Sequence, residues 1–254
     1  MPIEPTTVDP DLLRSLKALK LGHIAETLPQ RLRQARQEAL DPGHWLLLVL
    51  DDEVQRRRSM VASQRATKAG LQPGLWLEAW QRRPDIRYDH GLLEHLSGLS
   101  FIEQNFHVCI QGPVGVGKTM LAHALGHIAI RRGHTVRCYG AEALFAQLRA
   151  SRLDQSHGQL LRQLCAVELL IIDDIGLRQL MPVEVQDFAA IVEARHREGS
   201  MIVTSNREPG EWLPLLGDVL GAQAIVDRFA NNAYDLIIDG ASFRPLQKPS
   251  YRRT

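Results

Sequence analysis

The segment GPVGVGKT at residues 112–119 has the residue types and the spacing of a phosphate-binding loop. Its glycines let the backbone curl so that successive N–H groups point inward at phosphate oxygens. Lys118 supplies a positive charge for the β- and γ-phosphates, and the Thr119 hydroxyl is a ligand for Mg²⁺. Such a pattern also arises as a chance glycine-rich turn, but here it follows a predicted strand and precedes a predicted helix. The residues that we predict to form a nucleotide site are Gly112, Pro113, Val114, Gly115, Val116, Gly117, Lys118, Thr119 and Met120.

Two adjacent aspartates follow the apolar part of LLIIDDIG, at residues 169–176. A phosphate-binding loop needs a carboxylate on a neighbouring strand to hold Mg²⁺ through water, and we expect Asp173 to be that ligand. We expect Asp174 to orient or deprotonate the water that attacks the γ-phosphate. Two plainer interpretations stay open, namely a turn cap for Asp173 and a solvated loop carboxylate for Asp174. Because aspartate is shorter than the more usual glutamate, we expect hydrolysis to be slow or to improve in an assembled complex.

The elements that must position these residues are alternating strands and helices. Predicted strands are FHVCIQ, TVRCYG, ELLIID, SMIVTS and YDLIID, and predicted helices span residues 118–132, 141–152 and 182–198. This alternation is typical of an α/β fold, a parallel sheet flanked by helices. Ligands of such sheets bind outside the carboxyl ends of the strands, where both motifs fall.

The first part of the chain has a different, helical texture. In DLLRSLKALKLGHIAETL the apolar residues recur near helical spacing, and Pro29 is expected to open a further helix. Asp41 is expected to cap a helix that runs to about Lys68, with Gly70 as its stop. We therefore predict an N-terminal all-α domain at 1–70, a turn-rich linker at 71–88, an α/β domain at 89–247 and a tail at 248–254.

Composition sets outer limits on function. An apolar share of 44% and a charged share of 23% are typical of a globular protein, and a net charge of +1 neither demands nor excludes nucleic acid. No apolar run approaches the roughly 18 residues of a membrane helix, and the acidic, proline-containing N-terminus is no signal peptide. The three cysteines are expected to be reduced thiols. We expect a cytoplasmic protein without a membrane partner.

Basic residues cluster in the predicted helical domain. Lysine and arginine supply a salt-sensitive attraction to phosphate backbones, and no base-reading motif accompanies them, so any DNA contact should be independent of sequence. The plainer interpretation is a set of solvated helix faces, with the acidic run DDE at 51–53 available to neutralise the arginines. The candidate DNA-binding residues are Arg14, Lys17, Lys20, Arg56, Arg57, Arg58, Arg65 and Lys68.

With these motifs in order, the sequence resembles the IstB and DnaC-like ATPases of the AAA+ class, and IstB in particular. The stretches that carry the resemblance are GLLEHLSGLSFIEQNFHVCIQGPVGVGKTMLAHALG, VTSNREPGEW and IVDRFANNAYDLIIDGASFR. It is most specific from about residue 89 to 247 and looser over the N-terminal helices. The resemblance implies a P-loop AAA+ domain and ATP as the nucleotide, with an adenine pocket formed partly near Tyr88 to Phe101.

The same resemblance implies roles for three further residues. Asn206, at the end of MIVTSN, matches a sensor residue on the strand beside the Mg²⁺ strand, where it contacts the γ-phosphate and the attacking water. Arg228 resembles an arginine finger that acts on a neighbouring subunit, and Arg244 resembles a second sensor for the nucleotide of its own subunit. Each residue also has a plainer interpretation. Asn206 would be an asparagine in a turn after a strand, and Arg228 and Arg244 would be surface salt-bridge partners. Apart from the resemblance, Trp76 and Trp80 lie four residues apart and offer rings on which another group can stack, but we expect them to form a small core between the linker and the main domain.

The family implies an ATP-dependent helper of a DNA transposase. Such a protein assembles with itself on duplex DNA, in a ring or a spiral, prepares the target and recruits or stimulates the transposase. One alternative is a loader of a replicative helicase, marked by a preference for single strands. A second is a nucleotide-gated DNA scaffold with little hydrolysis, and Asp174 is its best support. A small-molecule kinase does not account for the strand end at Asn206.

Overall fold

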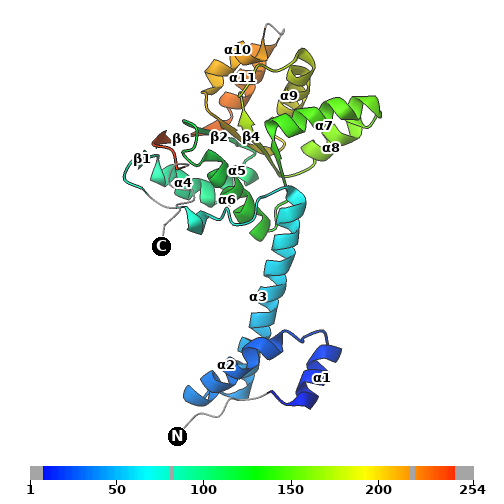
Figure 1. Ribbon diagram of the computed structural model, residues 1–254, viewed down its shortest axis with the longest axis vertical. Helices are drawn as coiled ribbons and strands as arrows, with labels where there is room; N and C mark the ends of the chain where they lie inside the picture. The colour runs from blue at the N-terminus through cyan, green and yellow to red at the C-terminus, as the bar shows by residue number, and fades with distance from the viewer. Residues whose placement is uncertain (1–7, 81–82, 218–220, 244–254) are drawn as a thin grey trace, which may run out of the picture. The chain divides into compact units, whose positions relative to one another are not determined.

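The computed structural model describes residues 8–80, 83–217 and 221–243 (Figure 1). The chain divides into two compact units, Met1–Gln64 and Arg65–Thr254. Among the described residues, no helix combines the length and the apolar character that crossing a bilayer requires.

The first unit is helical, as predicted. It contains α1 (Pro10–Ala18), α2 (Ile24–Gln37) and most of α3 (Pro42–Ala69) around a small core centred on Ile24, Leu28 and Val49. The predicted limits of α3 are confirmed. The Asp41 carboxylate accepts hydrogen bonds from two backbone N–H groups of the first turn, and Gly70 has a φ of +84° just beyond the last residue.

The prediction that Pro29 opens a helix is wrong, because α2 begins at Ile24 and Pro29 lies inside it. The chain instead turns after α1, where Lys20 has a φ of +58°. The backbone N–H of Leu21 donates to Leu16, and that of Lys20 donates to Lys17, which is the pattern of a Schellman C-cap. Glycine usually occupies this position, so a lysine there leaves no signal in the sequence.

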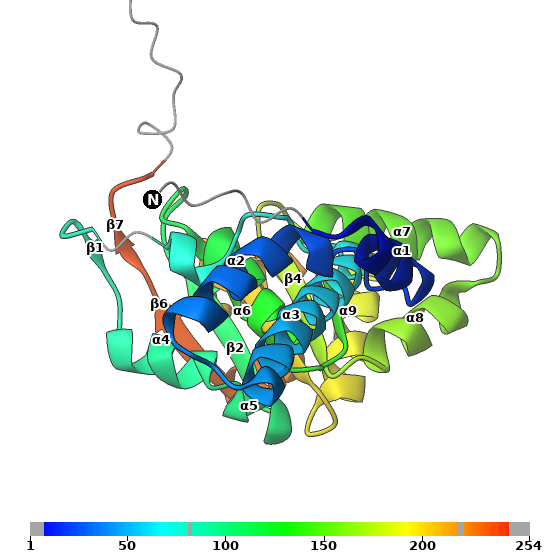
Figure 2. The same ribbon diagram turned by 90° about the horizontal axis from the view of Figure 1, so that it is seen from below.

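The second unit is built on a five-stranded parallel sheet. Its strands are β2 (His107–Gln111), β3 (Val136–Gly140), β4 (Leu169–Ile175), β5 (Ser200–Ser205) and β6 (Ala233–Ile237). All five predicted strands are confirmed, and their order is β3-β4-β5-β2-β6. The α/β fold class is therefore confirmed. A separate antiparallel pair joins β1 (Ile86–Arg87) to β7 (Asp239–Gly240), which lie side by side in Figure 2.

Helices cover both faces of the sheet (Figure 1). On one face lies α6 (Lys118–Arg131), where Gly126 approaches Ile171 so closely that an added Cβ would come within 2.8 Å of it. On the other face, α7 (Ala141–Leu153), α8 (His157–Cys165), α9 (Pro182–Arg195) and α11 (Ala222–Ala230) enclose a large apolar cluster. Shorter helices are α4 (His90–Ser97), α5 (Ser100–Glu103), α10 (Leu213–Leu216), η1 (Leu77–Ala79) and η2 (Pro209–Trp212).

The strand order corrects one expectation. The carboxylate strand β4 is not the neighbour of the P-loop strand β2, because β5 lies between them and pairs with both. The residue that follows β5 is therefore inserted between the phosphate-binding loop and the two aspartates. That residue is Asn206, so the topology places a polar amide at the centre of the predicted site.

Candidate functional site

The loop at residues 112–119 connects β2 to α6 and requires glycine at two positions for identifiable reasons. Gly112 has a φ of +146°, and a Cβ there would lie 2.0 Å from the Ile238 carbonyl oxygen. Gly117 has a φ of +101°, and a Cβ there would lie 2.3 Å from the indole ring of Trp80. At both positions a side chain is disfavoured for two reasons: the backbone has a positive φ, and an added Cβ would clash with a neighbouring residue.

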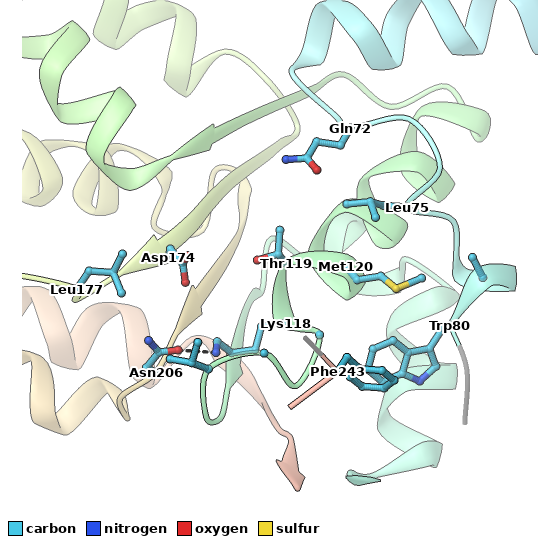
Figure 3. A pocket seen from close by; sticks show the side chains of 14 residues that line it. Gln72, Leu75, Trp80, Lys118, Thr119, Met120, Asp174, Leu177, Asn206 and Phe243 are labelled. Carbon is cyan, nitrogen blue, oxygen red and sulfur yellow. Dashed lines mark hydrogen bonds between the residues drawn. The ribbon is translucent and has the colours of Figure 1, made fainter. Parts of the chain in front are cut away.

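Lys118 is buried within this loop. Its Nζ donates to the carbonyl oxygens of Gly112 at 2.8 Å and Pro113 at 2.9 Å, and also to the Asn206 Oδ1 (Figure 3). The ammonium is thus held inside the curled loop by three oxygens from two separate parts of the chain. Two residues that were predicted independently, Lys118 and Asn206, are brought into direct contact.

A cavity of about 950 Å³ opens beside the loop, within the size range of small-molecule sites. Figure 3 shows that its two sides differ: Asp174, Leu177 and Asn206 lie on one side of Lys118 and Thr119. On the other side lie Leu75, Met120, Trp80 and Phe243. The cavity therefore has a mainly polar end next to the lysine and an apolar, aromatic end. The remaining lining residues are Gln72, Ala79, Val114, Gly115 and Gly117.

The two aspartates occupy a β-bulge at the end of β4. The register with β5 shifts between Ile172 and Ile175, and Asp174 has a φ of +62°. The Thr204 hydroxyl donates to the Asp173 carboxylate at 2.6 Å and accepts from the Asp174 backbone N–H at 2.8 Å. Asp174 is among the side chains that line the cavity, and Asp173 precedes it with one carboxylate oxygen turned to Thr204.

The predicted linker contributes to the same cavity. Residues 71–80, called the strap below, supply Gln72, Leu75, Ala79 and Trp80 to its lining. Two histidines of α6 hold the strap by its backbone: the Gln72 N–H lies 3.1 Å from His123 Nδ1, and the Gln72 carbonyl lies 2.8 Å from His127 Nε2. Burial lowers the pKa of His123 to about 4, so its ring is neutral at pH 7 and Nδ1 accepts the bond.

The two tryptophans of the strap face different ways. Trp76 packs on His127 with a centroid separation of 4.0 Å, which confirms the expected core contact with the main domain. Trp80 donates from its indole N–H to the Tyr88 hydroxyl at 3.0 Å and lies 5.6 Å from the Phe243 ring. The Phe243 backbone N–H in turn donates to the Gly115 carbonyl at 2.8 Å. Both aromatic rings are therefore anchored against the phosphate-binding loop.

The adenine pocket expected partly near residues 88–101 stays a prediction. Among the described residues, the apolar end of the cavity is lined by the strap and Phe243, and Tyr88 contacts the strap through the indole N–H of Trp80. The sequence contained a weak signal, the pair of tryptophans four residues apart, but only the folded chain shows that one of them covers Gly117.

The two predicted arginines lie outside the cavity lining or outside the described residues. Arg228, on α11, is about half exposed and pairs with Glu193 of α9 at 3.0 Å. This is the surface salt bridge that the sequence left open, and it leaves a role toward a neighbouring subunit untested. Arg244 lies outside the described residues.

The basic candidates of the N-terminal part divide into two groups. Arg14 pairs with Asp11, while Arg56 and Arg57 pair with the buried Glu53, which has its pKa lowered to about 2 mainly by Arg56. These arginines have structural partners, as the acidic run suggested. The exposed candidates for which the described part of the chain offers no ion pair are Lys17, Lys20, Arg58, Arg65 and Lys68.

A loop of this kind after β2, paired carboxylates on β4 and an asparagine after the intervening β5 define a P-loop nucleotide-binding domain of the AAA+ class. The family described as IstB-like ATP-binding protein matches residues 14–250. The chain belongs to that family.

Proteins of insertion sequences are similar to this chain along nearly their whole length. An insertion sequence ATP-binding protein of Mycobacterium tuberculosis is 31% identical over 242 residues, covering 95% of this chain and 96% of the relative. The ATP-binding protein of insertion sequence IS21 from Pseudomonas aeruginosa is 31% identical, with coverages of 92% and 88%. That of IS5376 from Geobacillus stearothermophilus is 32% identical, with coverages of 91% and 92%. The similarity thus includes the N-terminal helices.

Solved structures support the fold. AMPPCP-bound DnaA from Aquifex aeolicus superposes with a TM-score of 0.55 at 22% identity, covering 65% of this chain and 51% of that one. The DnaC helicase loader superposes with a TM-score of 0.53 at 17% identity, covering 65% and 97%. At these identities the likeness establishes the AAA+ architecture alone.

Proposed function

We propose that this protein binds and hydrolyses ATP and acts as an ATP-dependent helper of transposition. The observation that carries the nucleotide part is the two-ended cavity beside Lys118. Phosphates fit the polar end, where loop N–H groups, the amino end of α6 and the lysine converge. A nucleobase fits the other end, where Leu75, Met120, Trp80 and Phe243 offer apolar and aromatic surface.

Mg²⁺ fits the polar end as well, because the donors there are oxygens of a hydroxyl and of carboxylates. Thr119 would hold the ion directly and Asp173 through water, and the ion would neutralise charge on the β- and γ-phosphates. Asp173 keeps a carboxylate oxygen for this role, since Thr204 contacts its Oδ1.

Hydrolysis in this proposal depends on Asp174 and Asn206. Asp174 accepts a proton from the attacking water, and the Asn206 amide orients that water or the γ-phosphate. Arg228 completes the site of a neighbouring subunit, so turnover requires assembly. Arg244 is assigned to its own nucleotide by family resemblance only.

The transposition part rests on the relatives. Proteins that match this chain over nine-tenths of its length are insertion sequence ATP-binding proteins. We infer that a transposase is the partner and that the N-terminal helical domain, residues 1–70, contacts duplex DNA without reading its sequence. The strap belongs functionally with the ATPase domain that follows it, and the tail at 248–254 lies outside the described residues. A cytoplasmic location is part of the same proposal.

The test is a binding titration on duplex and single-stranded DNA with ATP, ADP or no nucleotide, at one fixed salt concentration, with particle size measured in parallel. Tight ATP-dependent binding to duplex, together with large assemblies, is the expected result. Binding confined to single strands would replace the proposal with a helicase loader. Assembly on duplex without measurable turnover, even with transposase present, would reduce it to a nucleotide-gated scaffold.

A further inference from the structure

The bulge at the end of β4 changes where the second aspartate points. Val203 and Ser205 pair with Ile172 and Ile175, so two residues, Asp173 and Asp174, stand opposite the single residue Thr204. Successive side chains of a regular strand point to opposite faces of the sheet. A bulge bends the strand and re-aims a side chain, and bulges are concentrated next to active sites.

The backbone of Asp174 shows how this is achieved. Its φ of +62° is in the left-handed region, which aspartate tolerates better than most residues with a side chain. Its side chain lines the nucleotide cavity on the same side as Asn206 (Figure 3). The bulge therefore turns the Asp174 carboxylate toward the cavity. This side chain is one methylene shorter than the usual glutamate.

Thr204 is the residue that holds this arrangement. It is fully buried in β5, and its hydroxyl is used in both directions at once. It donates to one carboxylate oxygen of Asp173 at 2.6 Å and accepts from the backbone N–H of Asp174 at 2.8 Å. A single hydroxyl thus fixes the orientation of the first carboxylate and the backbone of the second.

We propose that Thr204 is a positioning residue that locks the bulge, so that Asp173 and Asp174 are held in their two different roles. The proposal rests on the nucleotide site proposed above. In this proposal the bulge compensates for the short side chain of Asp174. An aspartate at this position therefore does not by itself imply weak hydrolysis.

The closing experiment compares Thr204→Val with Thr204→Ser. Valine keeps the shape and removes the hydroxyl, whereas serine keeps the hydroxyl. Ser200→Ala is a matched control, because Ser200 is equally buried at the other end of β5 and donates to the Phe101 carbonyl at 3.0 Å. Three quantities are measured for each protein: kcat and KM for ATP, the Kd of ADP, and the Kd of Mn²⁺ in the ADP complex by electron paramagnetic resonance.

Thr204→Val is expected to lower kcat by about 100-fold, because a misplaced catalytic group costs that much. It should also weaken Mn²⁺ binding about 10-fold, as the loss of a residue supporting a metal ligand does, while the Kd of ADP stays within about twofold because the loop and Lys118 are intact. Thr204→Ser should restore both properties. A Thr204→Val protein that matches Ser200→Ala in kcat and in Mn²⁺ affinity would overturn the proposal. If wild-type protein binds no nucleotide at all, the proposed function fails first.

Asp174→Glu tests the same geometry from the other side. The bulge already places the carboxylate of residue 174 in the cavity. A longer side chain should carry the carboxylate past the position of the attacking water, so kcat should fall. A rise in kcat would mean that Asp174 is simply too short, and the role assigned to Thr204 would be wrong. Where turnover is too slow to measure, the Mn²⁺ comparison between Thr204→Val and wild type decides.

Discussion

Lys118 is the side chain on which the nucleotide site depends most directly. Its ammonium is held by Gly112, Pro113 and Asn206, and the side chain lines the cavity. Lys118→Ala removes the positive charge that the loop at residues 112–119 provides for binding phosphate. ATP affinity should fall by about 100-fold, since hydrogen bonds to charged groups contribute roughly 1.5–3 kcal/mol. Calorimetric titration with ATP measures this, and ATP-dependent assembly should disappear with it.

Arg228 and Glu193 allow a role in catalysis to be separated from a role in stability. Arg228 is about half exposed and Glu193 is more exposed still, so their ion pair adds little to folding. Arg228→Ala should leave ATP binding by the monomer unchanged but lower turnover of the assembled protein at least 1,000-fold, as the loss of an arginine finger does. Glu193→Ala breaks the same ion pair and should leave turnover intact. If the two variants behave alike, Arg228 is only a salt-bridge partner.

Site residues that belong to a local sequence motif were predictable from the sequence. Site residues that distant parts of the chain bring to the cavity were not. Gly117 and Lys118 follow from the chemistry of a phosphate-binding loop. Thr204 does not, because an apolar strand with one threonine looks ordinary until a bulge opposite it is seen. Phe243 reaches the cavity only because the chain after β6 returns to bond Gly115.

The strap is the element whose function the structure changes most. If its Trp80, with Phe243, receives the base, Trp80→Leu should weaken ATP and ADP binding about 5- to 100-fold, the range expected for the loss of one stacking ring. Inorganic tripolyphosphate, which has no base, should bind as before. Competition titrations with both ligands measure the difference.

Trp76→Leu is the matched control for that experiment, since Trp76 packs on His127 in the same strap without lining the cavity. It should affect both ligands little and equally. Phe243→Leu repeats the test without touching the contact between Trp80 and Gly117, in case that contact is needed for folding. Equal losses for ATP and tripolyphosphate in Trp80→Leu would exclude a base site at this end.

Because the side chains of Leu75, Met120, Trp80 and Phe243 at the aromatic end are apolar, a base bound there would be contacted on its faces rather than on its polar edge. Purines offer more stacking surface than pyrimidines, so ATP and GTP should bind with affinities closer to each other than to those of CTP and UTP. Strong discrimination between ATP and GTP would require a polar group, such as the Gln72 amide or a backbone group, to read the base. Competition among the four nucleotides measures the order.

Two buried histidines link pH to the stability of the second unit. Burial lowers the pKa of His107 and of His123 to about 4, against an ordinary value of about 6.5. The unfolded chain therefore binds more protons between these values, and stability should be fully present above pH 6.5 and fall as the pH drops toward 4. The expected loss is on the order of 1–3 kcal/mol per histidine. Urea denaturation at pH 7.5, 6 and 5 measures it, and a flat profile would contradict both assignments.

Elements with strong local patterns were predicted well. Each of the five strands appears where its apolar β-rich run lies, and α3 begins at its aspartate cap. The break after α1 escaped because a lysine occupies the left-handed position. The family resemblance placed β5 beside β4, which is confirmed, but not between β4 and β2, since strand order depends on contacts between distant segments rather than on any local pattern.

At the scale of the whole molecule, a net charge of +1 means that attraction to DNA must come from local groups. Arg65 and Lys68 are exposed basic residues that, with Arg137, border one hollow of the second unit. The double variant Arg65→Ala, Lys68→Ala should reduce the slope of log affinity for duplex DNA against log salt by about 1.8, because each lost phosphate contact contributes about 0.9. Binding should be measured at saturating ATP over a range of salt concentrations.

Arg56→Ala is the informative contrast, because that arginine is committed to the buried carboxylate of Glu53. Its removal should lower the melting temperature and leave the salt slope unchanged, whereas the double variant should do the reverse. A slope that responds to Arg56 would mean that the pair with Glu53 opens on DNA. A slope that responds to neither variant would place the DNA contact on other residues, and the exposed group of Lys17, Lys20 and Arg58 would then be tested in the same way.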